Sequence, residues 1–291
     1  MTVLLLSCPD RPGLVAATST LIHHSGGNIA HADQHADDRH GLFVQRIEFE
    51  FPDGRSLDAF RSEFAVLAES LDMEWEMVEP DQRARVALLV SREGHCLLDL
   101  LSRIRLGELA ADVPVVISNH EDHREITEHY GVPFLHLPVD PVDKSAQQRA
   151  LLDALKEADV ELIVMARYMQ ILPSEIIDRF PRRIINIHHS FLPAFVGAKP
   201  YHQAYDRGVK IIGATAHYAT AELDQGPIIC QEVTPVSHRD TPDRLIRLGG
   251  HVAHDVDQGP RALHLADELG GDPTLRVQDD RDGDRAGRHV G

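Results

Sequence analysis

An asparagine and a histidine stand two residues apart at the end of an apolar run, where both side chains could act on one carbonyl group. Ile184–His188 has the alternation of a strand, so Asn186 and His188 project to the same side. An amide and an imidazole aimed at one point can stabilise the oxyanion that forms on a carbonyl under attack. Asp224, in the loop Ala221–Pro227, could orient and charge the imidazole and activate water.

Each of these residues also has an ordinary structural interpretation. A histidine such as His188 often fills a core or loop position, and an aspartate before Gln-Gly-Pro is a frequent turn former. A metal pair made by His188 and His189 is a weaker hypothesis, because neighbouring strand residues face opposite ways and no Cys or carboxylate ligand spacing accompanies them. The residues alone leave both the enzymatic and the structural interpretation open.

The residues that follow position 85 predict a sheet that could hold these side chains. Six brief, mostly β-branched apolar runs predict strands: Val86–Val90, Val113–Ser118, Leu162–Ala166, Ile184–His188, Ile211–Tyr218 and Ile228–Val233. Helical stretches lie around Cys96–Ile104, Gln147–Ala158 and Ser174–Phe180. Buried strands alternating with helices predict an α/β domain with a doubly wound, mainly parallel, Rossmann-like sheet. Ligands bind such sheets at the carboxyl ends of the strands, where Asn186 and His188 would lie.

Residues 1–80 predict a smaller and different unit. Strands are expected at Val3–Cys8, Asn28–Asp37, Leu42–Phe51 and Met73–Val78, with amphipathic helices that follow Gly13 and that run from Leu57 to Leu71. The order βαββαβ is a ferredoxin-like arrangement. Glu79–Arg85 is short and polar, and we expect it to be the linker to the second unit.

Composition restricts the partners of the chain. The 291 residues contain 29 Lys and Arg against 46 Asp and Glu, a net charge of −17, which argues against nucleic acid or an anionic membrane as a partner. A small anionic substrate held by a few local cations is still compatible with that charge. The three cysteines have no ligand spacing, no apolar run could span a membrane, and the first residues lack the features of a signal peptide. We therefore expect a cytoplasmic location.

Four separate blocks in the second unit resemble one enzyme family. They are Asn186–Phe195, Gly197–Tyr201, Gly213–Tyr218 and Glu222–Ile229, and they resemble the formyltransferase family that uses 10-formyltetrahydrofolate. The resemblance implies that Asn186, His188 and Asp224 are the catalytic residues. It also implies that the segment Ala166–Leu172 binds folate, with the pterin against Met169, Ile171 and Leu172.

The first unit resembles another family. The turn Cys8–Val15 is similar to the opening of ACT domains, which implies an amino-acid effector (glycine or methionine) bound by Asp10, Gly13 and Asn28, and a homo-oligomer. The free N–H groups at the start of the following helix can receive the carboxylate of such an effector. A plain turn between strand and helix is the alternative.

One member of the formyltransferase family carries an ACT domain, and the resemblance to it covers residues 1–248. That member uses water in place of an amine, so the chain is expected to release formate and tetrahydrofolate, to supply formate for purine synthesis and to balance one-carbon folate pools. Ser118-Asn119-His120 also resembles this member, which implies that Asn119 contacts the substrate. No metal and no redox cofactor is implied, since the folate is the substrate.

Two rival functions follow from the same resemblance. One is an amine formyltransferase, which resembles only the second unit. The other is an amino-acid sensor whose enzyme domain is inactive. The C-terminus supports this hypothesis, because residues 249–291 depart from the family pattern. Either real divergence or a shifted reading frame would explain that departure. The charged, apolar-poor sequence from about residue 271 predicts a disordered tail that contributes nothing to the site.

Overall fold

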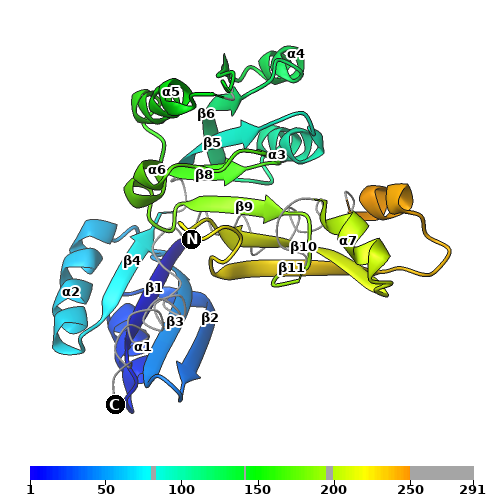
Figure 1. The fold of residues 1–291 in the computed structure, drawn as a ribbon. Helices are drawn as coiled ribbons and strands as arrows, with labels where there is room; N and C mark the ends of the chain where they lie inside the picture. Colours follow the sequence, from blue (N-terminus) through cyan, green and yellow to red (C-terminus); the bar gives the residue numbers. More distant parts are fainter. Residues whose placement is uncertain (80–82, 141, 195–198, 250–291) are drawn as a thin grey trace, which may run out of the picture. The chain divides into compact units, whose positions relative to one another are not determined.

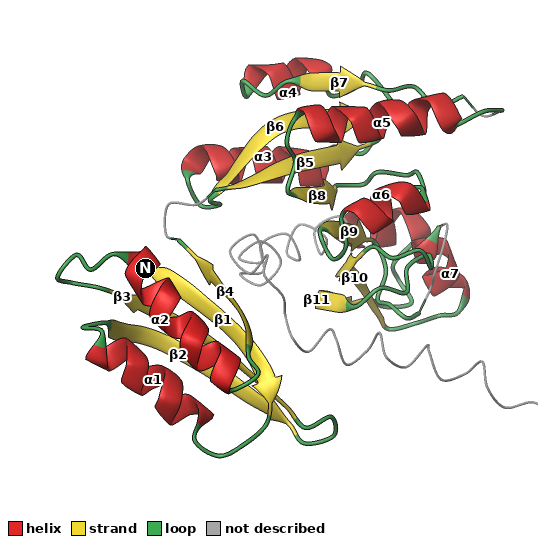
Figure 2. Ribbon diagram, turned by 90° about the vertical axis from the view of Figure 1, so that its left-hand side faces the viewer, coloured by secondary structure: helices red, strands yellow, loops and turns green. Residues whose placement is uncertain are grey.

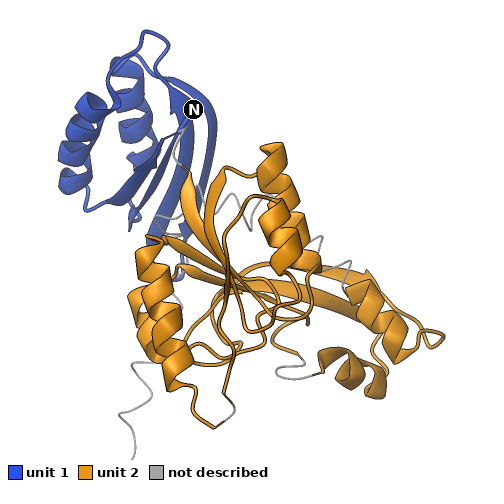
Figure 3. Cartoon of the chain, turned by 90° about the horizontal axis from the view of Figure 1, so that it is seen from above, with its two compact units in different colours: residues 1–82, 267–291 blue, residues 83–266 orange. Residues whose placement is uncertain are grey.

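The computed structural model describes residues 1–79, 83–140, 142–194 and 199–249. These residues fall into two compact units, residues 1–79 and residues 83–249, which Figure 3 colours separately. The tail predicted to be disordered lies outside the described residues, as does most of the segment that leaves the family pattern.

The first unit is a four-stranded antiparallel sheet with two helices. Its elements are β1 (Thr2–Pro9), α1 (Leu14–His24), β2 (Asn28–Asp37), β3 (Leu42–Glu50), α2 (Leu57–Ser70) and β4 (Glu74–Val78). The strand order is β2-β3-β1-β4, so the first strand of the chain lies inside the sheet (Figure 1). This is the βαββαβ arrangement that the sequence predicts.

Alternation in β1 decides which face of this sheet the helices cover. Leu4 and Leu6 pack in one cluster with Ile22 of α1 and with Phe60 and Phe64 of α2. Both helices therefore lie on the same face of the sheet, as Figure 2 shows.

The second unit is a seven-stranded sheet with helices on both faces. Its elements are β5 (Ala84–Val90), α3 (His95–Leu106), β6 (Ala111–Ser118), α4 (Arg124–His129), β7 (Phe134–His136), α5 (Ser145–Glu157), β8 (Leu162–Met165), α6 (Ser174–Arg179), β9 (Ile184–His188), α7 (Pro200–Asp206), β10 (Ile211–Tyr218) and β11 (Ile228–Pro235). Residues 242–249 are also helical. Apolar side chains of α5 and α6 pack on one face of the sheet, and α3 lies on the other (Figure 1).

The strand order β11-β10-β9-β8-β5-β6-β7 places the chain reversal between β5 and β8. From β5 the chain moves outward to β6 and β7, then returns to the other side of β5 as β8 and continues to β9. The strands from β9 to β7 pair in parallel, so the loops after β5, β8 and β9 emerge at one edge of the sheet. A ligand site is expected at such a reversal.

Several details differ from the sequence predictions. β5 begins at Ala84, so the predicted linker ends earlier than Arg85. β10 pairs antiparallel with both β9 and β11, so the sheet is parallel only from β9 to β7. The loop of residues 219–227 joins β10 to β11 without a crossover helix, as an antiparallel pair allows. The sequence did not predict α4, β7 and α7. These elements are three to seven residues long, which is too short for hydrophobic periodicity to reveal them. No helix in the described ranges is long and apolar enough to cross a membrane.

Candidate active site

Asn186 and His188 lie on the same face of β9, as the alternation predicts. Ile185 precedes Asn186, and Ile187 lies between Asn186 and His188. Both isoleucines are buried in the domain core. In the antiparallel pair of β9 and β10, Asn186 is directly opposite His217. Residues that are directly opposite in a sheet share a face, so the register brings a second imidazole to the amide.

Asp224 reaches the same place from the loop before β11. Its Oδ1 lies 3.4 Å from Nδ1 of His188, and the exposed fractions of the two side chains are 5% and 12%. The backbone of Asp224 is left-handed, with φ of 57°. A Cβ on Gly226 would lie 1.8 Å from the carbonyl oxygen of Tyr218, so only glycine permits this loop to pack so closely on β10. The structure therefore assembles all three predicted catalytic side chains.

His217 is a further member of the site that the sequence reasoning missed. Its Nδ1 lies 2.9 Å from the carbonyl oxygen of Tyr218, which can only accept, so Nδ1 carries the proton and Nε2 accepts. Nε2 lies 3.1 Å from Nδ2 of Asn186 and 3.9 Å from Oδ1 of Asp224. Burial lowers the pKa of His217, although the bond to Tyr218 and the charge of Asp224 oppose this shift. A neutral His217 thus fixes the orientation of the Asn186 amide.

The sequence contains one indication that His217 belongs to the site, because His217 lies in a block that resembles the formyltransferase family. That block does not show which neighbouring strand the side chain of His217 meets. The antiparallel register of β9 and β10 was needed to place it opposite Asn186.

The segment predicted to bind the pterin leaves the sheet after β8. Met169 and Ile171 are exposed apolar side chains, whereas Leu172 is buried in the core cluster. The N–H of Met169 donates to Oγ of Ser91 over 2.9 Å, and that hydroxyl donates to Oδ1 of Asn119 over 2.7 Å. Asn119, predicted to contact the substrate, is buried and is linked to the segment through Ser91.

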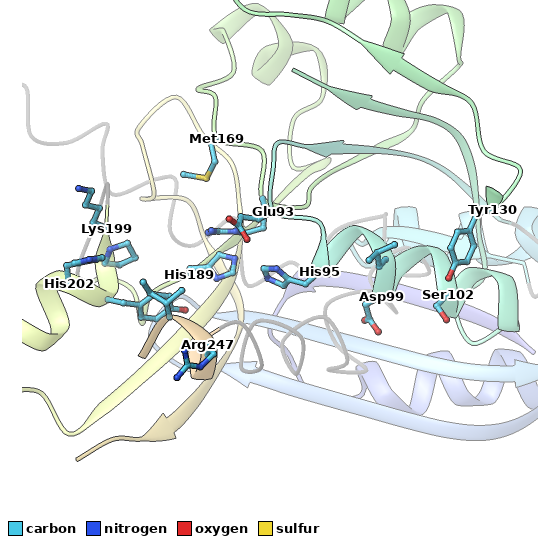
Figure 4. Close-up of a pocket in the computed structure, with 15 residues that line it drawn as sticks. Glu93, His95, Asp99, Ser102, Tyr130, Met169, His189, Lys199, His202 and Arg247 are labelled. Atoms are coloured by element: carbon cyan, nitrogen blue, oxygen red, sulfur yellow. The ribbon is translucent and has the colours of Figure 1, made fainter. Parts of the chain in front are cut away.

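A cavity of about 1040 Å³ opens beside this segment (Figure 4). Its lining residues are Glu93, His95, Leu98, Asp99, Ser102, Tyr130, Arg167, Met169, His189, Lys199, Pro200, Tyr201, His202, Ile246 and Arg247. Met169 is the predicted site residue among them. Asn186, His188 and Asp224 are not part of the lining, although His189, the neighbour of His188, is.

Comparisons with known proteins cover both units. Residues 2–67 match the ACT domain family, and residues 84–256 match the formyl transferase family. The formyltetrahydrofolate deformylase of Synechocystis sp. is 51% identical over 263 residues, which are 90% of this chain and 92% of that protein. The chain belongs to the formyltetrahydrofolate deformylase family.

Solved structures separate the deformylase family from its transferase relatives. A formyltetrahydrofolate deformylase from Pseudomonas syringae pv. tomato has a TM-score of 0.87 and 46% identity, covering 91% of this chain and 90% of that one. The glycinamide ribonucleotide transformylase 1 of Symbiobacterium toebii has a TM-score of 0.60 and 34% identity, covering 65% of this chain and 90% of that one. The deformylase likeness extends over nearly the whole chain, whereas the transformylase likeness covers about two thirds of it.

In the ACT domain of this deformylase family member, a hollow of about 550 Å³ lies at the start of α1. Asp10 and Gly13, two of the predicted effector contacts, line it. Gly13 has φ of 95° and precedes the helix, a conformation that favours glycine. Asn28, the third predicted contact, is exposed at the start of β2, opposite Glu50 of β3, and does not line the hollow.

Proposed function

We propose that the chain hydrolyses 10-formyltetrahydrofolate to formate and tetrahydrofolate, and that Asn186, His188 and Asp224 carry out the reaction. The observation that supports this most directly is the approach of His188 to Asp224 at 3.4 Å beside the Asn186 amide, in a chain of the deformylase family. The product formate supplies purine synthesis, and the release of tetrahydrofolate balances the one-carbon folate pool.

Water is the nucleophile in the proposed mechanism. Asp224 takes a proton from water, directly or through His188, and the oxygen forms a bond to the formyl carbon on N10. The carbonyl electron pair moves to oxygen, and the Asn186 amide and the protonated His188 stabilise this oxyanion. When the oxyanion reforms the carbonyl, the bond to N10 breaks, N10 receives the proton, and formate leaves.

The immediate surroundings of the three residues support these roles. Because Nε2 of His217 accepts one amide hydrogen of Asn186, the second hydrogen on the same nitrogen can be donated to the oxyanion. Asp224 and His188 are largely buried, and charges interact more strongly there than in water. The proposed steps use acid, base and hydrogen-bond donors, so no metal and no redox cofactor takes part in them.

The folate contacts and the regulation are further parts of the proposal. Exposed Met169 and Ile171 offer an apolar surface for the pterin, and Leu172 supports them from the core. An amino acid binds the hollow at Asp10 and Gly13, where its carboxylate meets the N–H groups of α1. A homo-oligomer formed through the ACT domain is supported by β2, an edge strand exposed along nearly its whole length.

Formate release in the absence of any amine tests this function. The full-length protein is incubated with 10-formyltetrahydrofolate alone, and formate and tetrahydrofolate are quantified. We expect both products in equal amounts. Formate transfer that appears only when an amine acceptor is added would instead establish a transferase, and tight amino-acid binding without turnover would establish an inactive sensor.

A further inference from the structure

Three side chains with nitrogen and sulfur donors meet at the sheet edge, outside the proposed catalytic residues. His95 and Cys96 open α3 after β5, and His189 directly follows β9. One ligand atom from each of the three lies within 4.8 Å of the others. In the described ranges, no other group of three or more His, Cys, Asp or Glu side chains meets this condition.

We propose that His95, Cys96 and His189 bind a divalent ion of the zinc class in the wall of the 1040 Å³ cavity. The two imidazoles and the thiolate are donors that favour Zn²⁺ over Mg²⁺ or Ca²⁺, which prefer oxygen ligands. His95 and His189 line the cavity, so the fourth coordination position faces it and takes water or a small anion.

The condition of His189 supports a ligand role. Its side chain is buried, with an exposed fraction of 4%, and Nε2 has no hydrogen-bond partner among the described residues. A buried polar nitrogen without a partner carries a free-energy cost, which a metal ion would remove.

Only a small rearrangement is needed to close the site. Zinc bond lengths of about 2.0–2.3 Å in a tetrahedron place neighbouring ligand atoms roughly 3.3–3.6 Å apart. The present separations, at most 4.8 Å, therefore contract by about 1 Å or a little more, which side-chain rotation can provide. The rings of His95 and His189 already approach edge to face, with centroids 5.5 Å apart.

Charged side chains near the site both oppose and favour the binding of a cation. The guanidinium of Arg167, in the segment after β8, is close enough to interact with Cys96 and repels a dication bound there. Glu93 in the cavity wall interacts with Arg167 and offsets its charge. The site is separate from the proposed hydrolysis, in which no step passes through a metal.

Cobalt binding to the full-length protein tests the proposal. The purified protein is treated with a chelator, kept reduced and titrated with Co²⁺, which gives a thiolate-to-metal charge-transfer band when a cysteine is a ligand. We expect one equivalent of Co²⁺ to produce this band and Zn²⁺ to displace it. Bound Zn²⁺ should also raise Tm, because the ion joins the start of α3 to the residue after β9 in the folded state alone.

Variants identify the ligands. Cys96→Ser should abolish the band, whereas Cys230→Ser, a matched thiol on β11 outside the cluster, should leave it unchanged. His95→Gln replaces a partly exposed ring and should weaken Co²⁺ binding by about 100-fold or more. This variant provides the test if Cys96→Ser fails to fold. Absence of the band in the parent protein, its persistence in Cys96→Ser, or unchanged affinity in His95→Gln would overturn the proposal. None of these readouts depends on deformylase activity.

Discussion

At the scale of the residue, the polar side chains of the proposed site are positioned by one another. Nδ1 of His188 lies 3.4 Å from the carboxylate of Asp224, and His217 keeps the Asn186 amide in one orientation. Buried polar groups of this kind act as a unit, so the loss of one member weakens the others.

Asp224→Asn should lower kcat by about 10²–10⁴-fold, because the amide is nearly isosteric but cannot act as a base. His188→Ala should have a similar effect, and the double variant should lose much less than the product of the two single losses. Glu222→Gln, an exposed carboxylate of the same loop, is the control and should retain full activity. Parent-like turnover by Asp224→Asn, measured as formate release, would refute the mechanism.

His217→Gln should lower kcat more than it changes KM, because it disturbs the orientation of Asn186 and leaves the folate surface intact. We expect a loss of about 10-fold to 100-fold, less than the roughly 10²–10³-fold effect of removing an oxyanion donor outright. Steady-state kinetics decide this point. A change confined to KM would show that His217 supports binding and does not position Asn186.

The buried His217 also predicts a pH dependence of stability. Its pKa is lowered from 6.5 in the folded state, so below pH 6.5 the unfolded chain binds a proton that the folded chain does not. The free energy of unfolding therefore decreases as pH falls from 6.5 to the folded-state pKa. Denaturant titrations should show a weaker decrease for His217→Gln, whereas His129→Gln, at an exposed position, should behave as the parent does.

At the scale of the element, sequence patterns predicted most of the framework, and of the side chains that meet at β9 they predicted Asn186, His188 and Asp224 but not His217. β9 and β10 have the predicted bounds, because each is a distinct apolar run that follows a charged residue, Arg183 or Lys210. The direction of β10 was not predictable, since periodicity is the same in parallel and antiparallel strands. The contact between His217 and Asn186 depends on that direction. The burial of Leu172 beside exposed Met169 likewise depends on where the chain bends after β8.

Gly226→Ala tests the element that carries Asp224. The added Cβ would overlap the carbonyl oxygen of Tyr218 at 1.8 Å, so the loop must move away from β10 and take the carboxylate with it. We expect kcat to fall as far as in Asp224→Asn, by about 10²-fold or more. Gly208→Ala, where φ is 63° but no atom lies within 4 Å of the added Cβ, should cost only about 1 kcal/mol of stability and no activity. Equal activities of the two variants would contradict this account.

At the scale of the whole molecule, one chain combines an ACT domain with a formyltransferase domain, and the deformylase of Pseudomonas syringae pv. tomato matches both. Water, the acceptor of a hydrolase, is always in excess, so the supply of an acceptor does not limit its rate. A separate signal can control such an enzyme, and the hollow at Asp10 and Gly13 is where we propose that it binds.

Asp10→Ala should abolish the change in activity that glycine or methionine produces and leave the rate without effector unchanged. Asp10 lines the hollow, whereas Asp38→Ala, in an exposed turn of the same unit, should retain the response. Formate release measured across effector concentrations provides the readout. A response that survives in Asp10→Ala would place the sensor elsewhere.

The hydroxyl of Ser91 joins three neighbouring parts of the second unit. It follows β5, accepts from the N–H of Met169 after β8 and donates to Asn119 after β6. Alanine at position 91 would leave the N–H of Met169 and Oδ1 of Asn119 without this hydrogen-bond partner. Each buried group left unsatisfied lowers the free energy of unfolding by about 1–3 kcal/mol. Positions 91 and 119 are therefore expected to covary among deformylases. A deformylase that lacks the hydroxyl at position 91 should also have an apolar residue in place of Asn119. Selection should eliminate a substitution at only one of the two positions.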